Sequence, residues 1–158
     1  MNVASYSSDA PKPLIPAIAA AADALSPFAE PLLRVTAGAL LLPHGLQKLF
    51  GLFGGYGVDA TEQFFSAKLG LPASFGLLAG LIEVVGGVAL AVGFGTRVAA
   101  AFVFALMAVA FAWVHLPIGF FWTNGGFEYP LMWAILAFAF IVRGGGRYSV
   151  DHWIGREI

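Results

Sequence analysis

The stretch from Arg97 to Pro117, RVAAAFVFALMAVAFAWVHLP, decides the fold class. After Arg97 it holds no Asp, Glu, Lys or Arg, and the next such residue along the chain is Glu128. A helix that crosses the hydrocarbon core of a bilayer needs roughly 20 predominantly apolar residues. This stretch therefore predicts a transmembrane helix.

Three other stretches approach the same length. They run over residues 31–50, 71–94 and 124–142. Pro31 and Pro72 stand where the first turn of a helix tolerates proline, and Asn124 is a suitable cap for the last helix. The turn over residues 93–96 is so short that the helices before and after it must be antiparallel neighbours. We expect an all-α fold, an integral membrane four-helix bundle.

The amino-acid composition is that of a protein surrounded by a lipid bilayer. Of the 158 residues, 59% are hydrophobic and 11% are charged, whereas soluble domains are about 45–50% apolar and about 25% charged. The net charge of −1 provides no basic surface for phosphates and excludes a nucleic-acid partner. The chain has no cysteine, so thiolate metal sites and iron–sulfur clusters within it are also excluded. Redox chemistry would therefore need a cofactor that is supplied from outside the chain.

The chain divides into three parts. Residues 1–30 form an N-terminal tail in which Pro11, Pro13, Pro16 and Pro27 should prevent one long helix, and whose apolar run 14–25 suits the bilayer surface. Residues 31–143 form the transmembrane domain and residues 144–158 a C-terminal tail. Four crossings place both termini on one side. Lys and Arg are more numerous there, which predicts cytoplasmic termini; that side has Lys12, Arg34, Arg97, Arg143, Arg147 and Arg156, the other only Lys48 and Lys68.

Ionisable side chains in a membrane span usually face the protein interior and mark function. On the second helix, Gly76, Gly80, Glu83 and Gly87 share one face, so Glu83 should be buried where another helix packs closely. Near the external ends of the helices we expect a polar cluster with Glu83 beneath it and Trp122 in the loop above. The members of this cluster are His44, Gln47, Lys48, His115 and Glu128.

Each of these residues also has a structural interpretation. Lys48 and Arg34 are near helix ends, where long basic side chains commonly reach the interface as anchors. Glu83 could pair with Arg34, and a single histidine is often a packing residue. The predicted first and third helices both begin with an Arg-Val pair, Arg34-Val35 and Arg97-Val98. A duplicated helix hairpin within the chain therefore remains an open alternative.

The ordered motifs of residues 32–151 resemble the DoxX family of small bacterial membrane proteins. They are Leu33-Arg34-Val35, His44-Gly45-Leu46-Gln47-Lys48-Leu49-Phe50-Gly51, Glu83-Val84-Val85-Gly86-Gly87, Thr96-Arg97, Asn124-Gly125-Gly126, Glu128-Tyr129-Pro130 and Gly144-Gly145-Gly146-Arg147-Tyr148-Ser149-Val150-Asp151. The resemblance implies four membrane helices in the bacterial inner membrane. It also implies redox metabolism, through the related quinone-reducing subunit of thiosulfate:quinone oxidoreductase and through partnership with superoxide dismutase and a sulfurtransferase.

Three functions remain open. A quinone-interacting redox subunit would use Glu83, His115, His44 and Glu128 for proton chemistry, and Gln47, Lys48 and Trp122 with the histidines to bind the head group. A soluble partner would supply the electrons. A non-catalytic scaffold would dock a partner protein on residues 143–158 or on residues 51–70. A haem- or metal-binding bundle would use His44 and His115, but nothing in the sequence demands it. We also expect a protein partner or a homo-oligomer.

Overall fold

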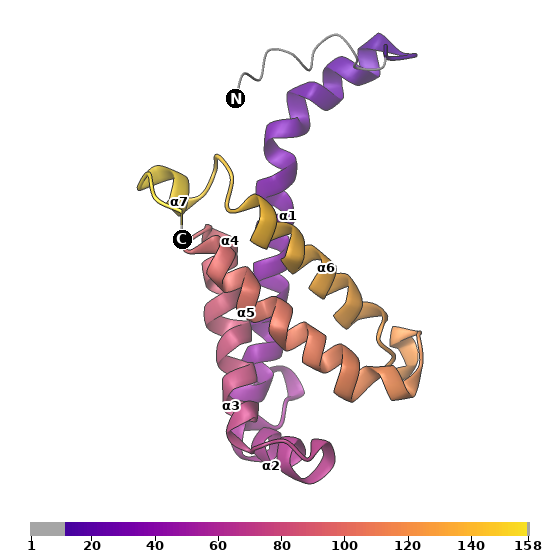
Figure 1. The fold of residues 1–158 in the computed structure, drawn as a ribbon, viewed down its shortest axis with the longest axis vertical. Coiled ribbons are helices and arrows are strands. Elements are labelled where there is room, and N and C mark those ends of the chain that lie inside the picture. Colours follow the sequence, from indigo (N-terminus) through magenta and orange to yellow (C-terminus); the bar gives the residue numbers. More distant parts are fainter. Residues whose placement is uncertain (1–11, 158) are drawn as a thin grey trace.

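The computed structural model describes residues 12–157, in which every regular element is a helix. Four helical rods run alongside one another (Figure 1). In chain order the elements are α1 (Pro16–Phe50), α2 (Gly57–Leu69), α3 (Ser74–Leu81), the π-helical segment η3 (Ile82–Gly86), α4 (Gly87–Val92), α5 (Thr96–Val109), the π-helical segment η4 (Ala110–His115), α6 (Glu128–Arg143) and α7 (Val150–Trp153). Segments α3, η3 and α4 form one rod, and α5 continues into η4. The predicted all-α fold class is confirmed.

Three rods are long and apolar enough to cross a membrane: Pro16–Phe50, Ser74–Val92 and Thr96–Ile118. The chain is therefore a multi-pass membrane protein. The fourth rod, α6, has 16 residues, or about 24 Å at 1.5 Å per residue. It begins four residues later than predicted, because Asn124 lies in a separate short turn, Trp122–Asn124. The expected cap is wrong, since Phe127 takes the N-cap position of α6.

Helix α1 corrects the prediction for the N-terminal tail. It begins at Pro16 and continues through Pro27, Pro31 and Pro43 to Phe50. Proline removes one intrahelical hydrogen bond, but membrane helices tolerate it because neighbouring groups and local adjustments satisfy the freed carbonyl. The first turns of α1 project beyond the other rods (Figure 1). Pro11 lies outside the described residues.

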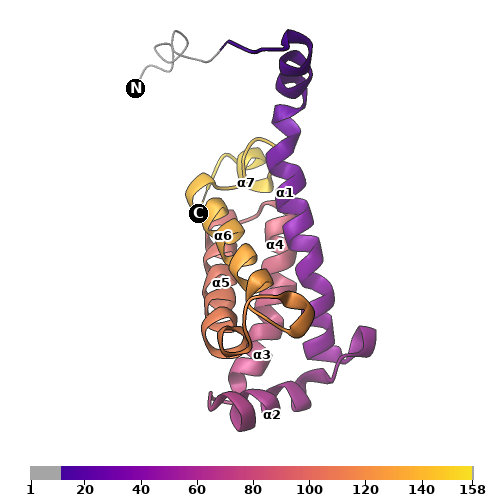
Figure 2. The same cartoon turned by 90° about the vertical axis from the view of Figure 1, so that its right-hand side faces the viewer.

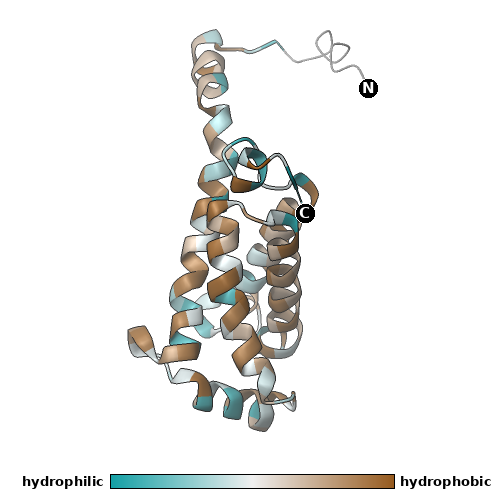
Figure 3. Cartoon of the chain, turned by 90° about the vertical axis from the view of Figure 1, so that its left-hand side faces the viewer, coloured by the Kyte–Doolittle hydropathy of each residue, from teal (hydrophilic) through white to brown (hydrophobic). Residues whose placement is uncertain are grey.

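The rods pack as two hairpins. Helix α1 pairs with the α3–η3–α4 rod to form the first hairpin, and α5 pairs with α6 to form the second. Gly38 of α1 and Gly87 of α4 meet backbone to backbone, and a Cβ on Gly87 would lie 2.8 Å from the Gly38 carbonyl oxygen. Their shared core consists of apolar side chains such as Leu41, Leu90, Val103 and Phe140. Hydrophilic residues concentrate towards the two ends of the rods (Figure 3).

The two ends of the bundle differ in architecture. At one end α7 and residues 154–157 lie against the end of α4 and the start of α5; we call this the termini end. At the opposite, loop end, α2 lies crosswise beneath the rods (Figure 2). Helix α2 packs against both α1 and α3. It therefore closes the loop end of the first hairpin, where the predicted polar residues of α1 are found.

Candidate functional site

A lysine–glutamate pair joins the two rods of the first hairpin near the loop end. The Lys48 Nζ atom donates hydrogen bonds to both carboxylate oxygens of Glu83, at 2.8 Å to Oε1 and 2.7 Å to Oε2. The Glu83 side chain is 6% exposed and that of Lys48 is 30% exposed. The carboxylate is thus buried, while the ammonium bridges the interior and the surface.

The backbone brings these two side chains together. Glu83 lies in η3, and π-helical segments are rare and frequently occur at functional sites. On the facing helix, Gly45 lets the rods approach, since a Cβ there would lie 2.9 Å from both the Cβ of Glu83 and the Gly80 carbonyl oxygen. The prediction that Glu83 is buried against protein among glycines is confirmed.

The alternative pairing of Glu83 with Arg34 is wrong, because Arg34 lies at the termini end. Arg34 is 1% exposed, so it is not an exposed anchor at the membrane boundary. Its Nη1 atom donates to the carbonyl oxygens of Leu90 and Ala91, both at 2.7 Å, and Nη2 donates to Tyr148 at 2.6 Å. Its Nε atom lies 3.3 Å from Glu30, an ion pair that lacks hydrogen-bond geometry. Arg34 therefore adds hydrogen bonds to the carbonyls of the last turn of α4, where Gly93 N also donates to the Leu90 carbonyl oxygen at 3.1 Å.

Lys48 also lines a pocket of about 450 Å³ at the loop end. The pocket has polar and apolar walls from the end of α1, the following loop and α2. Its lining residues are Gln47, Lys48, Gly54, Gly55, Tyr56, Ala60, Thr61, Phe64 and Phe65. Lys48 thus both lines this pocket, which we call the Lys48 pocket, and forms the ion pair with Glu83.

The loop that forms this pocket has a constrained backbone. Phe53 has φ +52°, a left-handed conformation that is uncommon for residues other than glycine. The Gln47 side chain stabilises it by donating from Nε2 to the Phe53 carbonyl oxygen at 3.1 Å. On α2, the Thr61 hydroxyl lies 2.7 Å from the Gly57 carbonyl oxygen and 3.3 Å from that of Lys48. Backbone strain of this kind often accompanies binding sites.

An apolar cavity adjoins the Lys48 pocket through Phe65, which lines both. This cavity has a volume of about 270 Å³ and lies between α3 and α5. Its walls include Phe75, Leu78, Phe102 and Trp113. We call it the apolar cavity. Phe65 thus lines both a partly polar pocket and an almost entirely apolar one.

The remaining predicted site residues do not join the Lys48 pocket. His44 is exposed on α1. His115 Nδ1 lies 2.6 Å from the carbonyl oxygen of Gly125, and Glu128 Oε2 accepts a hydrogen bond from the Trp122 backbone at 3.2 Å. His115 and Glu128 thus both contact the loop before α6, in which Trp122 lies, and neither of these contacts involves Gln47 or Lys48. Among residues 12–157, no group of three His, Asp or Glu side chains could hold a metal ion.

Sequence reasoning missed the residues that α2 and its N-cap contribute to the pocket. Tyr56, Thr61, Phe64 and Phe65 all lie in the 51–70 segment, which was considered only as a docking loop. The signal was present, since Asp59, Glu62 and Lys68 alternate with apolar residues at helical spacing, as in a helix lying at an interface. What the sequence could not show is that this helix folds back under Lys48.

At the termini end, Asp151 of α7 connects the two hairpins. It is 3% exposed and accepts hydrogen bonds from Gly95 N at 2.7 Å, Thr96 N at 2.9 Å and Thr96 Oγ1 at 2.7 Å. Burial by itself raises the pKa of a carboxyl group. The hydrogen bonds from Thr96 and Gly95 and the nearby Arg34 charge outweigh burial, so the pKa of Asp151 lies below its ordinary value.

These features define a class: a multi-pass helical membrane protein with a buried ion pair beside a partly polar pocket. The family model described as DoxX matches residues 31–116, more than half of the chain. The chain belongs to the DoxX family. It is similar to a protein of Bacillus subtilis (strain 168) named "Putative oxidoreductase CatD", with 35% identity over 102 residues that cover 64% of this chain and 69% of the relative. No solved structure matches the chain significantly.

Proposed function

We propose that this chain is a quinone-binding membrane subunit of a redox system and that a soluble protein partner supplies its electrons. Membership of the DoxX family and a relative whose name describes an oxidoreductase support a redox role. The observation that carries the proposal is the position of Lys48, which lines a partly polar pocket and bonds the buried Glu83.

The pocket has groups that suit a quinone head group. Quinone carbonyl oxygens accept hydrogen bonds, and Lys48, Gln47 and Tyr56 are donors among the lining residues. The rings of Phe64 and Phe65 provide apolar surface for the quinone ring. Reduction of a quinone consumes protons as well as electrons. Lys48 and Glu83 together hold an exchangeable proton beside the pocket, which is the role of a general acid.

The apolar cavity suits the tail of such a substrate. Membrane quinones carry an apolar chain, and a chain bound beyond Phe65 would contact only hydrocarbon and aromatic side chains such as Leu78 and Phe102. The head group would then remain in the Lys48 pocket. The adjoining positions of the two spaces therefore favour a lipid-soluble quinone over a small water-soluble one.

The test is quinone binding by the purified protein in nanodiscs, measured as quenching of tryptophan fluorescence by decyl-ubiquinone. Trp113 lines the apolar cavity and serves as the reporter. The variant carries Lys48→Gln and Glu83→Gln together, which removes both charges and leaves no buried ion unpaired. We expect binding to weaken about tenfold or more, as for the loss of a charged hydrogen bond. Lys68→Gln, a charge change on α2 outside the pocket, is the matched control.

Unchanged binding in the double variant would refute the site. If the wild-type protein neither binds decyl-ubiquinone nor retains quinone during purification, the non-catalytic scaffold becomes the better explanation. Electron transfer is a separate measurement, in which reduction of the quinone is followed after a soluble fraction from the source cells is added to the loaded nanodiscs.

We place the protein in the bacterial inner membrane with both termini in the cytoplasm. The termini end carries Arg34, Arg97, Arg143, Arg147 and Arg156, whereas Lys48 at the loop end is engaged with Glu83 and only Lys68 remains there. This asymmetry supports the orientation. Reporter fusions at residue 158 should be active with a cytoplasmic reporter, and fusions within residues 51–70 with an external one. The reverse pattern would invert the orientation.

A further inference from the structure

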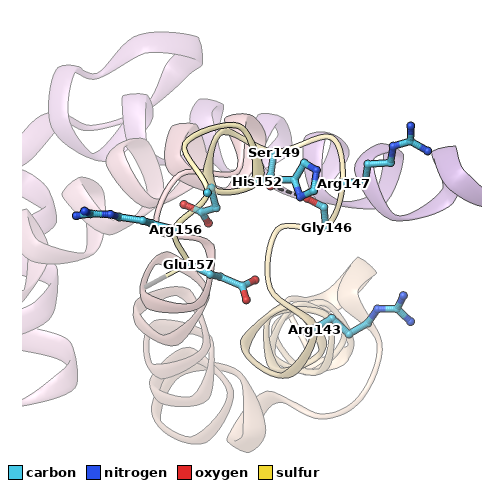
Figure 4. Close-up of a pocket in the computed structure, with 9 residues that line it drawn as sticks. Arg143, Gly146, Arg147, Ser149, His152, Arg156 and Glu157 are labelled. Atoms are coloured by element: carbon cyan, nitrogen blue, oxygen red, sulfur yellow. Dashed lines mark hydrogen bonds between the residues drawn. The ribbon is translucent and has the colours of Figure 1, made fainter. Parts of the chain in front are cut away.

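A basic groove lies at the termini end, far from the Lys48 pocket. It has a volume of about 690 Å³ and is formed by the last residue of α6, the following loop and α7. Arg143, Arg147 and Arg156 line it (Figure 4). We call it the arginine groove. Its position is independent of any role at the loop end.

The charges of the groove do not cancel. Its two carboxylates are engaged elsewhere, since Asp151 binds Gly95 and Thr96, and Glu157 pairs with Arg97 at 3.1 Å. Within residues 12–157, the side chains of Arg143, Arg147 and Arg156 have no hydrogen bond or ion pair to protein. Arg147 contacts only the ring of Tyr148, with its guanidinium carbon 5.8 Å from the ring centre. Three guanidinium groups are therefore free to bind anions.

The arrangement of these arginines suits an extended anionic surface. Arg143 and Arg147 extend on one side of the groove and Arg156 on the other, so they do not converge on a point (Figure 4). A single free phosphate is held by convergent donors. A layer of phospholipid head groups offers several phosphates side by side, which matches three separated guanidinium groups.

The surroundings of the groove have the character of a membrane interface. Arg143 ends α6, where the apolar rod stops. Trp153 is 85% exposed and Tyr148 is 46% exposed, and such aromatic residues concentrate at the level of lipid head groups. Tyr148 also stacks on Phe28 of the projecting part of α1, with ring centres 5.6 Å apart. Arginines flanked by exposed aromatic rings favour a lipid surface over a soluble acidic protein.

The groove is held rigidly against the bundle. The Asp151 N–H donates to the Gly93 carbonyl oxygen at 2.9 Å, and Arg34 binds the carbonyl of Tyr148. Helix α7 therefore cannot move without breaking contacts of both hairpins. A ligand that binds the groove should consequently stabilise the whole fold, because binding to the native state alone raises its stability.

We infer that the arginine groove binds the head groups of anionic phospholipids. The test is a titration of the detergent-solubilised full chain with phosphatidylglycerol, with phosphatidylcholine as the uncharged comparison, read as the rise in melting temperature. We expect phosphatidylglycerol to stabilise the protein more than phosphatidylcholine does, and added salt to reduce the difference. Combined Arg143→Gln, Arg147→Gln and Arg156→Gln should weaken the apparent affinity on the order of a hundredfold.

Two controls make the outcome decisive. Lys68→Gln, at the loop end, should keep the full response to phosphatidylglycerol. Replacement of the same three arginines by lysine should keep most of the response to phosphatidylglycerol, because the positive charges remain. This comparison distinguishes a loss of charge from a defect in folding. An equal response to inorganic phosphate alone would identify a soluble-anion site and overturn the inference. A triple glutamine variant that still responds as the wild type would overturn it as well.

Discussion

The two hairpins use the same device at the termini end and differ at the loop end. In the first hairpin Arg34 donates to the carbonyls of Leu90 and Ala91, and in the second Arg97 donates to those of Ile141 and Val142, all at 2.7 Å. In each case an arginine of one helix donates to carbonyls in the last turn of another, although Arg34 lies in the middle of α1 and Arg97 in the first turn of α5. The repeated Arg-Val pair thus has a geometric explanation that requires no duplication.

The difference between the hairpins lies in burial and charge. Arg34 is 1% exposed, whereas the Arg97 side chain is 39% exposed and is supported by the partly exposed Glu157. The first hairpin contains the buried Lys48–Glu83 pair, and no ion pair among residues 12–157 joins α5 to α6. The first hairpin therefore contains the buried ion pair on which the proposed quinone site depends, and the second completes the apolar core.

The largest expected effect is the difference in stability between variants of Arg34 and Arg97. Arg34→Met should lower the free energy of unfolding by about 3–5 kcal/mol, because it removes three hydrogen bonds to carbonyl oxygens and leaves the Glu30 carboxylate without its ion-pair partner. Arg97→Met should cost about 1 kcal/mol, since water can reach the freed groups. Denaturant unfolding in mild detergent measures both. Similar losses would remove the distinction between the hairpins.

The next effect tests the close packing of the first hairpin. A Cβ on Gly80 would lie 2.6 Å from Leu49 of α1. Gly80→Leu should therefore separate the rods and lower stability by about 3 kcal/mol, the upper range for overpacked cores. Leu81→Ala is the control, because Leu81 is 42% exposed. A larger loss for Leu81→Ala would mean that α1 and α3 do not meet through glycine.

The link between the hairpins should depend on pH. Because the pKa of Asp151 is lowered in the folded protein, its contribution is complete above the unfolded pKa of about 4 and is lost as pH falls through the folded value. Asp151→Asn should lower the free energy of unfolding by about 2 kcal/mol at neutral pH. Below pH 4, the stability of the variant should depend less on pH than that of the wild type. Melting temperature against pH compares the two proteins. If the melting temperature of the Asp151→Asn variant falls with decreasing pH as steeply as that of the wild type, other carboxyl groups cause the acid dependence.

Most of the fold followed from the sequence, because bilayer thickness fixes helix length and apolar composition marks the spans. The third span, the hairpin turn and the buried Glu83 were predicted correctly. The long α1 was missed because proline was treated as a helix breaker, a rule that holds less strictly in lipid. The partner of Glu83 was missed because η3 and the close approach at Gly45 are packing effects without a local signal.

The Lys48–Glu83 pair should show a measurable coupling in a double-mutant cycle. The cycle uses Lys48→Gln, Glu83→Gln and the double variant. We expect a coupling energy of about 1–2 kcal/mol, within the range for residues in direct contact. The single Lys48→Gln change should be the more destabilising, because it leaves a 6% exposed carboxylate unpaired. Additive losses would show that the two charges do not interact in the membrane protein.

The smallest effect is expected in the second hairpin, at His115. Its ring contacts the Gly125 carbonyl in an exposed loop, 2.6 Å away, and lies outside the lining of the Lys48 pocket. His115→Ala therefore removes one exposed hydrogen bond and should lower stability by about 0.5–1 kcal/mol. Decyl-ubiquinone binding should stay at the wild-type level, in contrast to the loss in the Lys48–Glu83 double variant. Fluorescence quenching and melting temperature of the same samples provide the comparison. A strong loss of binding with intact stability would move the head-group site towards the second hairpin and restore the two-hairpin cluster that the sequence suggested.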